Sequence, residues 1–252
     1  KVRIIHRSNT YHKVLPTEWE QIKEEYNHSS NKLLVLGQQS YSQEFIKELK
    51  AFVESSGIVL VADTVSNAHF LKPDFVRHHD LFLPLLGTKQ LEKMKPDLVI
   101  TMGGSLVSKP LKIFLRKYKP AFHWHVTEGD NAPDTFRALT RHLPVSSVAF
   151  LKMANRTSSG FELERNDIYS SIWHELERST CQKLKEYQVQ MVHSDFSAVF
   201  QVLQNLPNNS ILHVANSMAI RYVNFIGVPK QVELHSNRGT SGIDGCMSTA
   251  LG

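Results

Sequence analysis

Cysteine and long apolar runs are both scarce in this sequence of 252 residues. The two cysteines, Cys181 and Cys246, are too few for a disulfide framework or a four-ligand zinc site, so a reducing, cytoplasmic setting is expected. The longest apolar stretches, such as 58–62 and 98–102, hold about five residues, whereas a helix needs roughly 20 to span a bilayer. The sequence therefore predicts a protein without disulfides and without a membrane-spanning segment.

A strong excess of charge of one sign is also missing. The 29 Lys and Arg residues exceed the 24 Asp and Glu residues by only five, and the basic residues are scattered along the chain. There is no aromatic-rich basic stripe and no zinc-finger spacing, so nucleic acid is not an expected partner. Of the 13 histidines, His123 and His125 share one face of a predicted strand, but no third ligand stands at a metal-binding spacing. We expect no metal site, whereas small anionic substrates fit the charge balance.

Short β-branched and leucine-rich runs alternate with helical patterns, which predicts an α/β fold with a parallel sheet flanked by helices. The expected strands are 33–36, 58–62, 98–102, 122–126, 211–215, 231–235 and, with a weaker pattern, 81–83. The expected helices are 17–26, 41–54 with Ser40 or Ser42 as its cap, 108–118, 134–142, 194–206 and 217–225.

The pattern changes between residues 161 and 187, where the chain becomes charged and helical without any strand signal. The alternation of strands and helices restarts after this connector, so we place a boundary near residue 188. Residues 1–187 are then a central domain with a lead-in segment and a helical connector, and residues 188–252 begin a second α/β domain that they are too few to complete. Because the chain starts at Lys1 and stops within a helical pattern at 248–252, we expect a piece of a longer protein.

The glycine pair Gly103-Gly104, followed by Ser105, comes after a predicted strand and opens a predicted helix. Backbone amides at such a turn can receive a phosphate or a carboxylate, and Lys109 would add positive charge at the same sheet edge. Neither a GxGxxG nor a phosphate-binding GxxxxGK[ST] motif is present, so a plain tight turn that needs glycine is the favoured explanation. One hypothesis is therefore a non-catalytic α/β module that binds a nucleotide through Gly103-Gly104-Ser105.

A second dense motif covers residues 235–245 (HSNRGTSGIDG) and stands between a predicted strand and a helix. Its small residues let the backbone approach a ligand closely, and Arg238 carries a planar fork suited to a carboxylate. The run 239–242 superficially matches a nucleophile elbow, but Ile243 stands where that motif requires glycine, so a serine hydrolase is not expected.

Residues 237–245, followed by Ser-Thr-Ala at 248–250, resemble the SNRGxSGIDGxxSTA signature of the 2-succinyl-5-enolpyruvyl-6-hydroxy-3-cyclohexene-1-carboxylate synthases, thiamine-diphosphate enzymes of menaquinone biosynthesis. Residues 215–221 (ANSMAIR) resemble the GNSxxxR segment of that family, and 103–109 resemble its middle domain more weakly. The resemblance implies a central domain followed by the opening of a diphosphate-binding domain. The family's catalytic glutamate and its magnesium-binding motif have no counterpart here, so no catalytic residue, no bound cofactor and no activity are expected of these residues alone.

The resemblance implies three substrate-binding side chains. Arg221 and Arg238 match arginines that bind substrate carboxylates, and Lys109 matches a lysine that faces the substrate. Ser217 is expected to share this role. The family often has a second basic residue after the lysine, whereas this sequence has Pro110, which departs from the pattern.

The resemblance also implies a cofactor-binding set. Asn216 and Ser217 match the segment that lies against the cofactor diphosphate and the substrate. Ile243 matches the apolar residue that bends the cofactor into its V shape, and Ser241 matches a residue whose carbonyl oxygen faces the aminopyrimidine ring.

The implied reaction of the full-length protein uses thiamine diphosphate and Mg²⁺ to decarboxylate 2-oxoglutarate and to add the succinyl carbanion equivalent to isochorismate. Both substrates are polyanions, which suits two arginines near the site. A homodimer or higher homo-oligomer is expected, because family members place active sites between subunits. The alternative within the same chemistry is another thiamine-diphosphate enzyme, a 2-oxo-acid decarboxylase or an acetohydroxyacid-synthase type, against which the motif at 237–245 argues.

Overall fold

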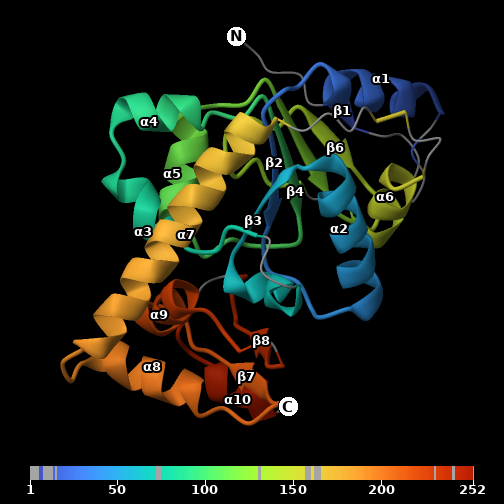
Figure 1. The fold of residues 1–252 in the computed structure, drawn as a ribbon. Helices are drawn as coiled ribbons and strands as arrows, with labels where there is room; N and C mark the ends of the chain where they lie inside the picture. Colours follow the sequence, from blue (N-terminus) through green and yellow to red (C-terminus); the bar gives the residue numbers. More distant parts are fainter. Residues whose placement is uncertain are drawn as a thin grey trace.

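A computed structural model of the chain describes residues 6–7, 14, 16–71, 75–129, 132–156, 160–161, 166–229, 231–239 and 242–251. These residues form a larger α/β unit and a smaller carboxyl-terminal unit that lies against one edge of it, and one long helix runs along both (Figure 1). The carboxyl ends of the central strands face the smaller unit, which positions the site described below.

The described part of the larger unit contains a six-stranded sheet in the order β1-β6-β5-β4-β2-β3, with every neighbouring pair parallel. All residues of β2, β3 and β4 are buried, as a sheet covered on both faces requires. The α/β fold predicted from the sequence is therefore confirmed. The strands are β1 (His6–Arg7), β2 (Lys32–Leu36), β3 (Val59–Ala62), β4 (Leu98–Met102), β5 (Phe122–Val126) and β6 (Arg141–Leu143).

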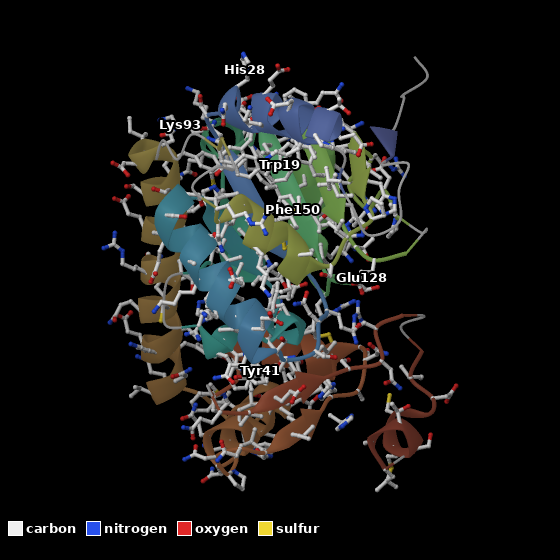
Figure 2. The ribbon with its side chains drawn as sticks, turned by 90° about the vertical axis from the view of Figure 1, so that its right-hand side faces the viewer. Trp19, His28, Tyr41, Lys93, Glu128 and Phe150 are labelled. Atoms are coloured by element: carbon white, nitrogen blue, oxygen red, sulfur yellow. The ribbon has the colours of Figure 1, made fainter. Side chains whose placement is uncertain are left out.

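Helices cover both faces of this sheet, and alternate strand residues supply two separate hydrophobic cores. On one face, the rings of Trp19 and Phe150 pack edge to face with their centroids 6.3 Å apart, and this contact joins the first helix to the sixth (Figure 2). The helices of that face are α1 (Pro16–Asn27), α2 (Gln43–Ser56) and α6 (Ser147–Ala154). The other face carries α3 (His79–Phe82), α4 (Thr88–Lys93), α5 (Lys109–Lys117) and α7 (Asp167–Val189), and the short 3-10 turns are η1 (Thr64–Ser66), η2 (Ala68–Phe70) and η3 (Leu83–Leu85).

The ends of the predicted helices follow from local capping. Ser42, one of the two predicted caps, accepts a hydrogen bond from the Phe45 amide at 3.3 Å, and Gly57 ends α2 in the left-handed conformation at φ 63°. Ser108 caps α5 in the same way, because its Oγ accepts from the Leu111 amide at 3.0 Å. The predictions for 41–54 and 108–118 are confirmed to within two residues.

Two predicted elements are wrong. The expected helix at 134–142 is a compact turn followed by β6, because the Asp134 carboxylate accepts the amides of Ala138 and Leu139 at 2.8 and 2.9 Å. Arg137 adopts the left-handed conformation at φ 55°, which no helix continues. The weak strand expected at 81–83 is helical, since α3 leads directly into η3 with Pro84 in its first turn.

From Asp167 onward, the connector predicted at 161–187 is a single helix of 23 residues, α7. Asn166 caps it by accepting from the Tyr169 amide at 3.0 Å, and Tyr169 and Trp173 bury the first half against the central sheet. The second half of α7 continues toward the carboxyl-terminal unit (Figure 1). None of the helices in the described ranges is both long and apolar enough to cross a membrane.

The carboxyl-terminal unit is built on two parallel strands, with Leu212 beside Leu234 in the register. Its core contains Leu203, Ile220 and Val223 from the helices above this pair. The boundary near residue 188 stays a prediction. The elements are α8 (Asp195–Gln204), β7 (Ile211–His213), α9 (Met218–Ile226), β8 (Glu233–His235) and α10 (Cys246–Leu251).

Candidate functional site at the junction of the two units

The loops that follow β2 and β4 lie against each other at the carboxyl edge of the sheet. The Gly37 amide donates to the Met102 carbonyl at 3.0 Å, and the Gly104 amide donates to the Gln38 carbonyl at 2.8 Å. A Cβ atom on Gly37 would stand 2.1 Å from the Gly104 oxygen, so only glycine permits this approach. Glycines in these two loops therefore serve the packing of backbone on backbone.

The segment after β3 holds the carboxyl-terminal unit in place. Asn67, at φ 57°, donates from Nδ2 to the Leu234 carbonyl at 3.1 Å and accepts the Leu234 amide at 2.8 Å, as a neighbouring strand would. His69 Nε2 lies 2.7 Å from the Val232 carbonyl oxygen, and Gln38 donates to the Ser236 carbonyl at 2.8 Å. These contacts fix β8, and with it the start of the 235–245 motif, to the central sheet.

Tyr41 marks the same junction on the side of α2 (Figure 2). Its amide donates to the Glu233 carboxylate at 3.3 Å, and the centroid of its ring lies 4.1 Å from the centroid of the Phe70 ring. Two segments of the central unit, those after β2 and after β3, therefore contact the carboxyl-terminal unit at this junction.

The amino terminus of α5, which the sequence predicted as a possible site for an external anion, binds a carboxylate of the chain itself. Asp63 Oδ2 accepts the backbone amides of Val107 and Ser108 at 2.5 and 3.1 Å, at the start of α5. Asp63 is buried at the end of β3. Because its carboxylate takes the place that a phosphate would need, this geometry disfavours the nucleotide module built on Gly103-Gly104-Ser105.

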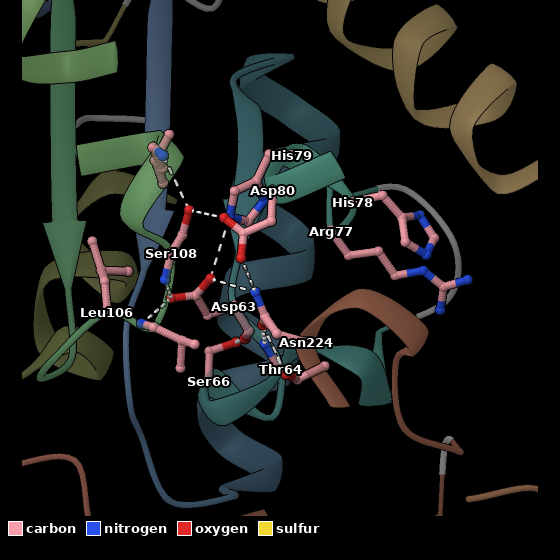
Figure 3. A network of polar contacts seen from close by, with 12 residues as sticks. Asp63, Thr64, Ser66, Arg77, His78, His79, Asp80, Leu106, Ser108 and Asn224 are labelled. Atoms are coloured by element: carbon pink, nitrogen blue, oxygen red, sulfur yellow. Dashed lines mark hydrogen bonds and ion pairs between the residues drawn. The ribbon is translucent and has the colours of Figure 1, made fainter. Parts of the chain in front are cut away.

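A buried polar cluster joins Asp63 to the carboxyl-terminal unit through Asn224 of α9 (Figure 3). Asn224 Nδ2 donates to Asp63 Oδ1 at 3.2 Å and to Asp80 Oδ2 at 2.9 Å. Its Oδ1 accepts from the Thr64 amide at 2.9 Å and from the Thr64 hydroxyl at 2.8 Å. All four hydrogen-bonding positions of this amide are therefore used.

His79 and Ser108 complete the cluster. His79 Nε2 lies 3.2 Å from Asp63 Oδ1, and the Ser108 hydroxyl donates to Asp80. Burial lowers the pKa of His79, but the hydrogen bond to Asp63 and the charge of Asp80 outweigh burial and raise it above its ordinary value. Burial alone would raise the pKa of Asp63, yet the hydrogen bond with His79 and that side chain's charge hold it below its ordinary value. Both shifts favour the charged forms, so His79 and Asp63 form an ion pair whenever His79 is protonated.

The two carboxyl-terminal motifs meet at Asn216 and Arg238. Arg238 donates from Nη1 to Asn216 Oδ1 at 3.0 Å and from Nη2 to the Leu106 carbonyl at 3.3 Å. Asn216 in turn donates to the carbonyls of Asn237 and Gly242, each at 2.6 Å. The structure thus brings Asn216 and Arg238 together and ties both to the loop after β4.

The other predicted site residues that the structure describes lie at the surface. Arg221 is exposed on α9, and its positive charge adds to the effect of burial in lowering the pKa of Arg238. Ser217, at φ 71°, precedes α9, and its side chain makes no capping hydrogen bond. Lys109 is exposed at the first position of α5, and Ile243 is 71% exposed. Ser241 lies outside the described residues.

A cavity of about 480 Å³ lies at the carboxyl ends of β2, β4 and β5. Burial and the neighbouring His142 lower the pKa of His125 in its wall to about 4, so this imidazole is neutral near pH 7. Thr101 and Thr127 add neutral polar groups, and the described lining carries no Lys or Arg, which does not suit a phosphate. No group of three or more His, Cys, Asp or Glu in the described ranges could hold a metal ion.

Sequence reasoning missed the residues that build the junction. Asp63 follows a buried strand, which is a position where polar side chains often serve a site, so the strand pattern contained a signal for it. Asn67 and Asn224 stand in segments whose local pattern indicates only a turn and a helix. Their partners are distant in sequence, so no spacing rule identifies them.

Comparisons with known proteins agree with the motifs. The family model described as the middle domain of thiamine pyrophosphate matches residues 11–214. A protein of Cytophaga hutchinsonii is 33% identical over 251 residues, covering 99% of this chain and 43% of the relative. Proteins of Flavobacterium johnsoniae and Bacteroides fragilis are 35% and 31% identical, covering 95% and 100% of this chain but 42% and 43% of themselves. All three are named 2-succinyl-5-enolpyruvyl-6-hydroxy-3-cyclohexene-1-carboxylate synthase, and the chain spans less than half of their length.

Proposed function

Because this chain belongs to the thiamine pyrophosphate enzyme family whose middle domain it contains, we propose that it is part of a 2-succinyl-5-enolpyruvyl-6-hydroxy-3-cyclohexene-1-carboxylate synthase. Such an enzyme decarboxylates 2-oxoglutarate and joins the remaining succinyl unit to isochorismate. The observation that carries the proposal is the arrangement of Arg238, which Asn216 and the Leu106 carbonyl hold in one orientation beside Arg221.

The described residues fit a bound diphosphate. The α9 amino terminus has no capping hydrogen bond from the Ser217 side chain, so its first amides are available to an anion. Asn216 holds the backbone at Asn237 and at Gly242 near this helix end through two hydrogen bonds, and the side chain of Ile243 remains exposed for an apolar contact. When bound, thiamine diphosphate supplies the electron sink for the loss of CO₂.

The role of this chain's own side chains is to bind and orient the anionic substrates. Arg238 is partly buried, so its guanidinium interacts with a carboxylate in a medium of lower dielectric than water. Two of its nitrogens are fixed by protein acceptors, which orients the plane of the fork before substrate arrives. Arg221, on the exposed side, is the second candidate for a substrate carboxylate.

Several groups of the complete reaction must come from elsewhere in the protein. Mg²⁺ needs a set of oxygen ligands, and no acidic cluster in the described ranges provides one. Family motifs identify no catalytic glutamate in these 252 residues. We therefore expect the chain alone to be inactive, and the full-length protein to act as a homodimer or higher homo-oligomer.

The test uses the full-length protein with thiamine diphosphate, Mg²⁺, 2-oxoglutarate and isochorismate, following CO₂ release and isochorismate consumption together. In that assay, Arg238→Ala should raise the KM for one carboxylate substrate at least tenfold, about 1.4 kcal/mol or more. The matched control is Arg178→Ala, which removes an exposed arginine of α7.

Release of CO₂ without isochorismate consumption would contradict the proposed synthase activity and would indicate another thiamine-diphosphate enzyme that acts on 2-oxo acids. Unchanged kinetics of the Arg238→Ala variant for both substrates would remove Arg238 from the substrate site.

A further inference from the structure

Lys112 of α5 reaches the candidate site although no motif points to it. It lies one turn beyond Lys109, and its side chain is half-buried, whereas Lys109 is exposed. Helical side chains lean toward the amino terminus of their helix, and Lys112 Nζ accordingly donates to the Leu106 carbonyl at 3.1 Å. The central unit thus directs an ammonium group into the loop after β4.

The same carbonyl oxygen of Leu106 accepts from Arg238 Nη2 at 3.3 Å. An ammonium from the central unit and a guanidinium from the carboxyl-terminal unit therefore share one neutral acceptor. Two cations at this spacing repel each other, and the positive charge of Arg238 contributes, after burial, to a lowered pKa of Lys112.

The nearby carboxylates are engaged elsewhere. Asp63 accepts two backbone amides and lies against His79, and Asp80 accepts from Ser108 and Asn224. Their charges act on Lys112 only from a distance, and no residue in the described ranges forms an ion pair with it.

An external carboxylate beside Lys112 and Arg238 would relieve this repulsion. A carboxylate has two oxygens, so it can accept from an ammonium and from a guanidinium at the same time. The backbone carbonyl that both cations share holds them ready for such a ligand, at little cost in reorganisation.

We propose that Lys112 binds a substrate carboxylate jointly with Arg238. Lys112 is then a second basic residue of the central unit, after Lys109, that serves the substrate site. The inference rests on the proposed function, because it concerns the carboxylates of the same substrates. Both 2-oxoglutarate and isochorismate carry two carboxylates, and the kinetics of each substrate will show which of them Lys112 contacts. The position after Lys109 is Pro110, so Lys112 is the next basic side chain on this helix.

The test compares Lys112→Gln, Lys112→Arg and Lys119→Gln in the full-length enzyme with cofactor and Mg²⁺. The glutamine amide can still donate to the Leu106 carbonyl, so Lys112→Gln removes the charge while leaving a hydrogen bond for the loop. Lys119, exposed just beyond α5, is the matched control for charge loss. Equilibrium binding of isochorismate, measured by calorimetry without 2-oxoglutarate, provides a second readout.

We expect Lys112→Gln to raise the KM of one substrate at least fivefold with kcat changed less than twofold, and Lys112→Arg to restore most of the loss. Weaker calorimetric binding of isochorismate would assign Lys112 to that substrate, and unchanged binding with a raised KM for 2-oxoglutarate would assign it to the other. If Lys112→Gln matches the Lys119→Gln control for both substrates, or lowers kcat alone, the proposal is overturned. If the unaltered enzyme consumes neither substrate, the proposed function fails first.

Discussion

Asn224 is the side chain whose loss should most weaken the junction between the two units. It is 1% exposed, and replacing it by leucine leaves a side chain of similar volume without any of its four hydrogen bonds. Asp80 Oδ2, the Thr64 amide and the Thr64 hydroxyl would each lose the partner that they have in the cluster.

The magnitude follows from those groups. Each buried polar group left without a partner costs about 1–3 kcal/mol, and a carboxylate lies at the upper end. The gain from burying an apolar leucine offsets part of this, so we expect Asn224→Leu to destabilise the protein by about 3–5 kcal/mol. Asn224→Asp should be at least as damaging near pH 7, because it places a third carboxylate against Asp63 and Asp80.

The assay is urea unfolding of the full-length protein, followed by tryptophan fluorescence, with Asn205→Ala as the control. Asn205 makes one exposed hydrogen bond, to the Gln201 carbonyl at 2.8 Å, so its loss should change stability by about 0.5 kcal/mol or less. A second measurement compares Asn224→Asp at pH 5 and pH 7, since acid should recover part of its stability. If Asn224→Leu unfolds within about 0.5 kcal/mol of the unaltered protein, the cluster does not hold the units together.

Two further predictions concern the same edge of the sheet. Gly37→Ala should lower the free energy of unfolding by about 2 kcal/mol or more and raise the KM for a carboxylate substrate, because its Cβ would displace the loop that carries the Leu106 carbonyl. The control is Gly104→Ala, whose Cβ would make only an ordinary contact at 3.6 Å with the Gln38 carbonyl oxygen. Equal stability of the two variants would contradict the argument. Because the pKa of His79 is raised on folding, the stability that His79 contributes is complete below its ordinary value of 6.5 and is lost as the pH rises through the higher folded value. Because the pKa of Asp63 is lowered, the stability that Asp63 contributes is complete above 3.8 and is lost as the pH falls through the lower folded value. The Tm difference between the unaltered protein and His79→Gln should therefore be largest between about pH 4 and pH 6.5 and shrink at alkaline pH, and a difference independent of pH up to 10 would refute the ion pair.

Much of the fold was predictable because its signals are local. Strands β2 and β4 appear as short apolar runs, and caps such as Ser42 and Ser108 are recognisable from the sequence around them. The failure at 134–142 has a local cause as well. One carboxylate there accepts two amides and creates a turn, a choice that helical periodicity cannot distinguish from a helix start.

The candidate site was predictable only in part. The sequence motifs contain both Asn216 and Arg238, but the hydrogen bond between them appears only in the fold; Lys109 is exposed, and Lys112 is the lysine that reaches the Leu106 carbonyl. A lysine's direction depends on which face of its helix is buried and on what lies opposite, and the spacing of basic residues contains neither.

The sequence by itself determined the alternation of strands and helices, their caps and the two family motifs, because each of these depends on neighbours a few residues apart. Tertiary structure alone decided what the helix amino terminus after Gly103-Gly104-Ser105 binds. There the carboxylate of Asp63 takes the place offered to a ligand, and Asn224, 161 residues away, locks that carboxylate to the next unit. Burying each of these polar groups costs free energy unless a matching partner is buried with it, and that matching exists only once the chain has folded.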